Sequence, residues 1–325
     1  MIRAVLLIVV LALVSAPASA QRWVEHAKRE FPLTDFSTHS IDLAEIMSGG
    51  PSRDGIPAID EPRFLPLAEI EGLADTEPVI GLTINGDMRA YPLRILMRHE
   101  IANDEVGGVP VTVTFCPLCN TAIVFDRRLG DRVLDFGTTG RLRKSDLVMY
   151  DRQTETWWQQ FLGEGLIGEL TGARLKMIPS RLESFAEFKA RAAGADAQVL
   201  VPARGGLNGH RNPYVGYDSN HRPFLYRGPL PEGIPALARV VRVGGEAWSV
   251  ALLRRRGVIE TGELRLTWRA GQNSALDTSH IPNGKDVGTV VVQRRVGEDW
   301  EDTVYSVDFA FAFTAFHPDG VLHLE

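Results

Sequence analysis

The chain has 325 residues, of which 44% are hydrophobic and 23% are charged. These proportions are typical of a globular protein and exclude a disordered or collagen-like chain, and the length suggests about two domains. The formal net charge of -6 provides no basic surface for a phosphate backbone, so nucleic acid is not expected as a partner.

The first twenty residues have the pattern of a secretory signal peptide. Arg3 is followed by the apolar run 4–14 and then by small residues that end in Ala-Ser-Ala at Ala20. The apolar run is too short to cross a bilayer as a helix. We therefore expect cleavage after Ala20, no integral membrane segment in the mature chain, and a periplasmic or secreted protein.

Turn residues and composition divide the remaining chain into four parts. Residues 21–56 form a loop-rich N-terminal segment, and 57–206 form a first lobe that contains both cysteines. Residues 207–235 are dense in Gly, Pro and Asn and are interpreted as a linker, and 236–325 form a second lobe. Strand patterns dominate both lobes, so the predicted class is α+β, predominantly β.

Local signals predict several elements of the first lobe. Asn85-Gly86-Asp87 lies between two apolar runs and indicates a hairpin turn. A short helix is expected over 93–103, and strands are expected over 109–115 and 121–125. Ser184 precedes Glu187 by three residues, a capping box that predicts a helix over 184–193.

A similar order of elements recurs in the last third of the chain. The run Ile123–Asp131 matches Val290–Glu298, and the strand, turn and helix pattern ahead of the first run has a counterpart over 240–256. We interpret this as two related lobes from an internal duplication, with the second copy degenerate. In place of the two cysteines, the second copy has a longer loop with the polar residues Ser274, Asp277, His280, Lys285 and Asp286.

Long motifs follow one another in a fixed order between residues 90 and 154. They are Ala90–Leu96, His99-Glu100-Ile101, Asn103-Asp104, Thr114–Thr121 and Ser145–Thr154. In these motifs the chain resembles the bacterial and archaeal domain-of-unknown-function family numbered 3179, over most of residues 57–202. The resemblance implies no established activity. Asn120 stands where members of the family often have Gly.

The motif Cys116-Pro117-Leu118-Cys119 is the strongest chemical feature and contains both cysteines of the chain. Two thiolates at this spacing can bind one metal ion, or can act as a redox or nucleophilic pair. They can also form a short disulfide, which would contribute little stability because it closes so small a loop. Strand-forming residues after Cys119 argue against a thioredoxin-like helix at this point.

His99 is the third candidate residue because it precedes the strand that leads to Cys116. As metal ligands, Cys116, Cys119 and His99 would bind Cu(I) or Zn, with His280 and Asp277 from the second lobe completing the site if the lobes pack face to face. In an enzyme, Cys116 would be the nucleophile or redox thiol, Cys119 the resolving thiol and His99 the base. The ordinary alternative for His99 is a hydrogen bond to a backbone carbonyl.

A second group of polar and aromatic residues carries weaker signals. Glu100 and Asp104 would share a helix face near His99, and Trp157 and Trp158 would face opposite sides of a strand, one in the core and one free to line a binding surface. The acids and Arg152 that flank the strand over 147–150, Asp146 among them, are expected to form structural pairs.

These patterns predict an exported soluble protein with a soft-metal-binding or thiol-redox site. Its partner would be a small molecule or another exported protein, and whether it is an enzyme is left open. The alternative is a non-catalytic periplasmic ligand-binding or interaction protein, in which the CxxC motif is a short structural disulfide.

Overall fold

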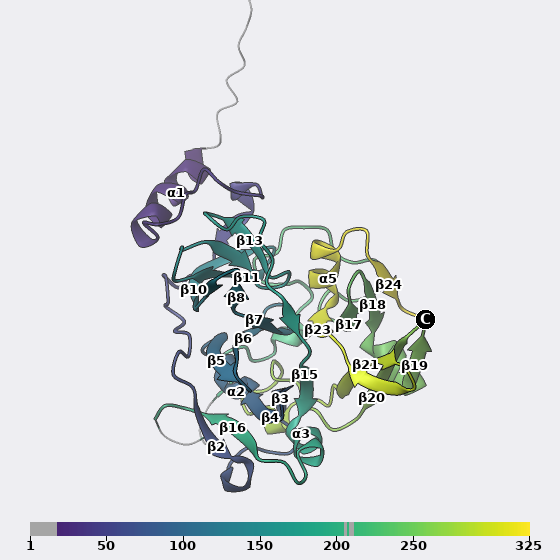
Figure 1. Ribbon diagram of the computed structural model, residues 1–325. Coiled ribbons are helices and arrows are strands. Elements are labelled where there is room, and N and C mark those ends of the chain that lie inside the picture. The colour runs from purple at the N-terminus through teal and green to yellow at the C-terminus, as the bar shows by residue number, and fades with distance from the viewer. Residues whose placement is uncertain (1–17, 205–206, 208–210) are drawn as a thin grey trace, which may run out of the picture.

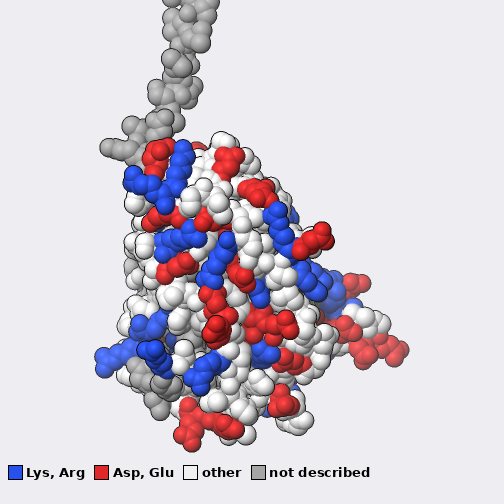
Figure 2. Space-filling model, turned by 60° about the vertical axis from the view of Figure 1, so that its left-hand side comes forward, with Lys and Arg blue, Asp and Glu red and all other residues white. Residues whose placement is uncertain are grey.

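The computed structural model describes residues 18–204, 207 and 211–325 (Figure 1). Most of the predicted signal peptide, residues 1–17, lies outside this range. Strands dominate the described residues, and none of the helices found there is long and apolar enough to cross a bilayer. Acidic and basic side chains are interspersed over the face that Figure 2 shows.

Five sheets of four or five strands are arranged as a five-bladed β-propeller. The first blade contains, in spatial order, β15 (Arg181–Ser184), β3 (Pro78–Ile84), β4 (Asp87–Pro92), β16 (Ala197–Val201) and β2 (Arg63–Pro66). The second contains β14 (Met177–Ile178), β7 (Thr121–Asp126), β6 (Val109–Cys116) and β5 (Ile101–Val106). The third contains β1 (Ile46–Ser48), β10 (Phe136–Arg143), β11 (Asp146–Asp151), β12 (Trp157–Gln159) and β13 (Glu164–Ile167).

The last two blades come from the C-terminal part of the chain. One contains β23 (Ser306–Phe309), β17 (Arg239–Val243), β18 (Glu246–Ser249) and β24 (Val321–His323). The other contains β19 (Val258–Thr261), β20 (Leu264–Arg269), β21 (Thr289–Val296) and β22 (Asp299–Asp302). A small hairpin of β8 (Arg128–Leu129) and β9 (Arg132–Val133) and the helices α1 (Ala18–Glu30), α2 (Leu93–Leu96), α3 (Phe185–Arg191), α4 (Val250–Arg256) and α5 (Ala310–Phe316) complete these elements.

The prediction of two related lobes from an internal duplication is wrong. One continuous cluster of buried apolar side chains extends from Leu73 to Phe316 and takes residues from all five blades. In addition, β23 packs against β7 and β15 packs against β21, so strands expected in different lobes lie against each other (Figure 1). The repetition that the structure shows is that of blades around a shared core. The two similar runs lie in different blades, in β7 and β21, and the protein is mostly β rather than α+β.

Two of the local predictions are confirmed. The hairpin of β3 and β4 turns at Asn85 and Gly86, both of which have positive φ. Ser184 caps α3, and its side chain accepts a hydrogen bond from the amide of Glu187. Both features depend on a few consecutive residues, so the sequence signal was sufficient.

The predicted helix over 93–103 is wrong beyond its first turn. Helix α2 ends at Leu96, and the chain then enters β5 at Ile101. Residues of β5 pair with β6 along their whole length, from Ile101 opposite Thr114 to Val106 opposite Val109. Pairing with a neighbouring strand has overridden the local helical pattern, as tertiary context commonly does.

The N-terminal segment packs against the third blade through aromatic side chains. Ala27 and Phe31 are fully buried with Trp157, and the rings of Phe31 and Trp157 lie 5.0 Å apart in an edge-on arrangement. Arg141 of β10 forms an ion pair with Glu30 at 2.9 Å. Helix α1 is therefore fixed to the fold by its C-terminal half, downstream of Ala20.

Candidate functional site

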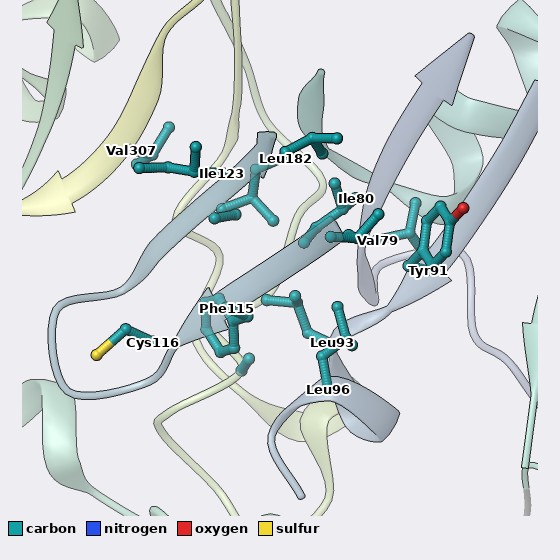
Figure 3. Close-up of a cluster of buried hydrophobic side chains, with 14 of the residues drawn as sticks. Val79, Ile80, Tyr91, Leu93, Leu96, Phe115, Cys116, Ile123, Leu182 and Val307 are labelled. Atoms are coloured by element: carbon teal, nitrogen blue, oxygen red, sulfur yellow. The ribbon is translucent and has the colours of Figure 1, made fainter. Parts of the chain in front are cut away.

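The two cysteines lie in the turn that joins β6 to β7. Cys116 is the last residue of β6 and pairs with Thr121, the first residue of β7. Asn120 adopts a φ of 54°, in the left-handed region, and its amide donates to the carbonyl of Pro117. In Figure 3 the sulfur of Cys116 points away from the buried apolar cluster around Phe115 and toward this turn. The turn places both thiols at one end of the second blade.

Asp146 of the third blade completes a cluster with these thiols. It begins β11, after a turn in which Lys144 and Ser145 both have positive φ. One carboxylate oxygen of Asp146 and the two sulfur atoms all lie within 4.8 Å of one another. Sequence reasoning assigned Asp146 a structural role. Its position at the start of the apolar strand Leu147–Tyr150 was the one signal that its carboxyl group would be buried.

The carboxyl group of Asp146 is oriented by the third blade. Its Oδ2 atom accepts hydrogen bonds from Gln159 Nε2 at 2.6 Å and from the amide of Phe161 at 3.0 Å. Its Oδ1 atom is buried and has no hydrogen-bond partner within the described residues. Thiols are weak donors, so the cluster contains a buried acceptor that its neighbours satisfy poorly.

Burial dominates the electrostatics of the cluster. Cys119 and Asp146 are completely buried and Cys116 is 2% exposed. This burial raises the pKa of Cys116 and raises the pKa of Cys119 well above its usual range, and it raises the pKa of Asp146 to about 6. The nearby Asp146 carboxyl raises both thiol pKa values further. Without a bound cation, the thiols therefore remain protonated at neutral pH.

A pocket of about 490 Å³ adjoins the cluster. Leu118, which lies between the cysteines, and Leu147, which follows Asp146, both line it. Tyr217 also lines it and donates a hydrogen bond from its hydroxyl to the carbonyl of Leu118 at 3.0 Å. Two residues of the pocket wall, Leu118 and Leu147, are thus direct chain neighbours of the thiol and carboxyl groups.

Glu100 is the acidic residue of this pocket. It has a φ of 59° and is 7% exposed, and the Tyr214 hydroxyl donates to its Oε1 at 3.4 Å. Burial, with a smaller contribution from nearby Asp146, raises the pKa of Glu100 to about 8, although the hydrogen bond from Tyr214 opposes this shift. Asp104, expected on the same helix face, instead lies on β5, where its carboxylate accepts hydrogen bonds from Arg89 and Tyr91. Glu100 therefore lines the pocket, whereas Asp104 forms hydrogen bonds with side chains of β4.

The two predicted histidines lie outside the cluster of Cys116, Cys119 and Asp146. His99 is half-buried, and its Nδ1 atom is 2.8 Å from the carbonyl oxygen of Pro57. His280 is exposed and precedes the short 3-10 helix Ile281–Asn283. The structure brings together the two predicted cysteines and adds an aspartate that was not among the predicted ligands.

Trp157 and Trp158 are both fully buried, so neither side chain is available to a partner. Trp158 packs in the main core and donates from Nε1 to Asp151 at 2.9 Å. Trp157 packs in the smaller cluster under α1. The predicted opposite orientation is confirmed, but the second face is covered by the N-terminal segment, and the chain's own residues fill the expected binding surface.

Comparison with known families gives one match. A family model described as a protein of unknown function, DUF3179, matches residues 53–320, which include the cysteine turn, Asp146 and Glu100. No curated protein and no solved structure matches the chain. Because the match extends over most of its length, the chain belongs to the DUF3179 family of proteins of unknown function.

Proposed function

We propose that the chain is a metal-binding protein in which Cys116, Cys119 and Asp146 hold a zinc ion. The observation that carries the proposal is the meeting of two thiols and one carboxyl group, from two different blades, within 4.8 Å in a buried site. Deprotonated, the three groups would place three negative charges in the interior, which is costly without a cation. A divalent ion would offset most of that charge and bind the unsatisfied Oδ1 atom of Asp146.

The ligand set favours zinc over Cu(I). Cu(I) prefers soft sulfur ligands, whereas Zn²⁺ accepts thiolate and carboxylate together. Zinc sites with three protein ligands keep a fourth position for water or a substrate. The pocket next to Leu118 and Leu147 supports a site of this open kind.

Thiol redox chemistry is the second candidate, because both cysteines are free and share one turn. In that function the pair would lose two electrons and two protons to an exported oxidant and form a disulfide. Burial and the raised thiol pKa values oppose attack by either sulfur, since the thiolate is the nucleophile. Metal binding is therefore the better-supported function.

Export is a separate part of the proposal and is supported by the signal-peptide pattern before Ala20. Helix α1 extends through this position, from Ala18 to Glu30. Cleavage after Ala20 would leave the contacts of Trp23, Ala27 and Phe31 with the third blade intact. The N-terminal residue of the mature protein, determined by intact mass, tests this part.

Native mass spectrometry and elemental analysis test the metal site, on protein recovered without reductant or chelator. We expect one zinc per chain, lost in Cys116→Ser and Cys119→Ser and weakened in Asp146→Asn. His99→Gln and His280→Gln are matched controls and should retain the ion. A metal-free protein lighter by two hydrogens would instead support the redox function. Zinc that persists in the cysteine variants would overturn the proposed ligand set.

A further inference from the structure

The pocket beside the cluster has the size and lining of a small-molecule site. Its volume of about 490 Å³ lies in the range that holds drug-sized ligands. Most of its wall is apolar, with Ile56, Leu118, Leu142 and Phe224 among the lining side chains. A ligand of this pocket therefore needs an apolar body.

The pocket also has polar lining residues. The carboxyl group of Glu100 accepts a hydrogen bond from the hydroxyl of Tyr214 at 3.4 Å, and Tyr217 lines the same pocket. Arg141 also lines the pocket, but its guanidinium is engaged by Glu30 at 2.9 Å. Arg222 lines it as an exposed residue. The buried polar lining thus includes an acid and two tyrosines.

Two thiolates and a carboxylate around Zn²⁺ would keep one net negative charge in the neighbouring cluster. The pKa of Glu100 is about 8, so its carboxyl group is largely protonated at neutral pH and adds a second negative charge only above that pH or when a cation lies beside it. Carboxylates beside aromatic rings form favourable sites for organic ammonium groups, through charge-assisted hydrogen bonds and cation–π contacts. An anionic ligand would be repelled by the metal cluster and, above about pH 8, by Glu100 as well.

We infer that this pocket binds a small organic amine, with its ammonium group on Glu100 and its apolar body against Leu118, Leu142 and Phe224. The inference rests on the proposed function in one respect, the negative charge of the metal cluster. Glu100 and the two tyrosines line the pocket whether or not a metal ion is bound. It assigns the pocket a ligand class: monoamines with an aromatic or branched aliphatic body.

Isothermal titration with three matched probes tests the inference. The probes are 2-phenylethylamine, the neutral 2-phenylethanol and the anionic phenylacetate, titrated into the purified protein whose zinc content has been measured. The titrations are made at about pH 9, above the pKa of Glu100, where the amine is still largely cationic. The amine should bind at least about tenfold more tightly than the alcohol, since a charge-assisted contact adds this much affinity. Glu100→Gln should abolish the difference. Glu105→Gln, at an exposed position of β5, should bind as wild type does.

A second variant keeps the test decisive if Glu100→Gln fails to fold. Tyr214→Leu removes an aromatic ring and the hydroxyl next to Glu100, and it should weaken amine binding by several-fold. Equal binding of amine and alcohol, tighter binding of phenylacetate, or unchanged amine binding in both variants would overturn the inference. If zinc-loaded protein does not bind the amine, only the inference is refuted. If the protein binds the amine but contains no zinc, only the proposed metal is refuted.

Discussion

The amide of Phe309 donates a hydrogen bond of 2.8 Å to the carbonyl of Cys119, which joins β23 directly to the cysteine turn. Two side chains extend this contact. Asn120 donates to the carbonyl of Val307 at 2.9 Å, and the hydroxyl of Thr121 donates to Asp308 at 2.8 Å. The turn that positions the thiols is therefore held by residues nearly two hundred positions later in the chain. Changes in β23 are expected to disturb the site.

Asn120 has two separable roles, which a pair of substitutions can distinguish. Asn120→Gly keeps access to the left-handed φ of 54° but removes the hydrogen bond to Val307, at a cost of about 1–3 kcal/mol. Asn120→Ala loses the same bond and adds about 1 kcal/mol of backbone strain. Urea unfolding should rank the stabilities as wild type, then Gly, then Ala. Equal stability of the two variants would show that φ carries no cost here.

Arg242 and Asp308 form a buried ion pair behind the cysteine turn. Arg242 Nε is 2.9 Å from Asp308 Oδ2, and both side chains are less than 10% exposed. Arg242→Met would leave the carboxylate without its cation and should cost about 3–5 kcal/mol. The double change with Asp308→Leu should recover part of the loss.

The exposed pair of Arg294 and Glu263, at 3.2 Å, is the control for this ion pair. Arg294→Met is expected to change the free energy of unfolding by less than about 0.5 kcal/mol, since exposed pairs contribute little. Chemical denaturation of the single and double variants measures all of these values. A loss at Arg242 as small as that at Arg294 would mean that Asp308 is solvated in the native protein.

Both thiols should resist alkylation in the folded protein. Cys116 and Cys119 are buried and their pKa values are raised by that burial, so at neutral pH neither offers an accessible thiolate. After removal of metal by a chelator, iodoacetamide should label the folded chain at least about tenfold more slowly than the unfolded chain. Mass spectrometry counts the labels. Rapid labelling of one thiol would favour the redox function over the metal site.

Features determined by neighbouring residues could be predicted from the sequence. The hairpin at Asn85-Gly86, the Ser184 cap and the proximity of the two thiols all follow from patterns of a few residues. The site itself combines residues that are far apart in the sequence. Asp146 approaches Cys119 through the turn between β10 and β11, and no local signal links a carboxyl group to thiols so many residues earlier.

His99 and Glu100 show how an error in secondary structure changes a site. If residues 93–103 formed a helix, the spacing of His99 and Glu100 along the helix would decide which of them faces the site. In the structure the helix ends at Leu96, and the following turn holds Glu100 in a left-handed conformation beside the pocket while the His99 ring contacts Pro57. The residue that lines the pocket is therefore Glu100, whereas the sequence pattern had indicated His99 as the site residue.

Glu100 should make the stability of the metal-free protein depend on pH. Its folded pKa of about 8 exceeds the ordinary value of 4.5 because burial disfavours the charged form. Between these two values the folded state holds a proton that the unfolded state has released. The contribution of Glu100 to stability is therefore full below pH about 4.5 and declines as pH rises through about 8, by an amount on the order of a few kcal/mol.

Glu100→Gln removes this titration while keeping the shape of the side chain. We expect the free energy of unfolding of the variant, relative to wild type, to increase from about pH 5 to about pH 8, since only wild type must bury a charge at the higher pH. Glu105→Gln controls for the loss of one carboxyl at an exposed site of β5, the strand that follows Glu100. Urea unfolding of chelator-treated protein gives the comparison. A difference between Glu100→Gln and wild type that stays constant with pH would show that the Glu100 carboxyl is already ionised in the folded protein, with solvent or a cation in the pocket compensating its charge.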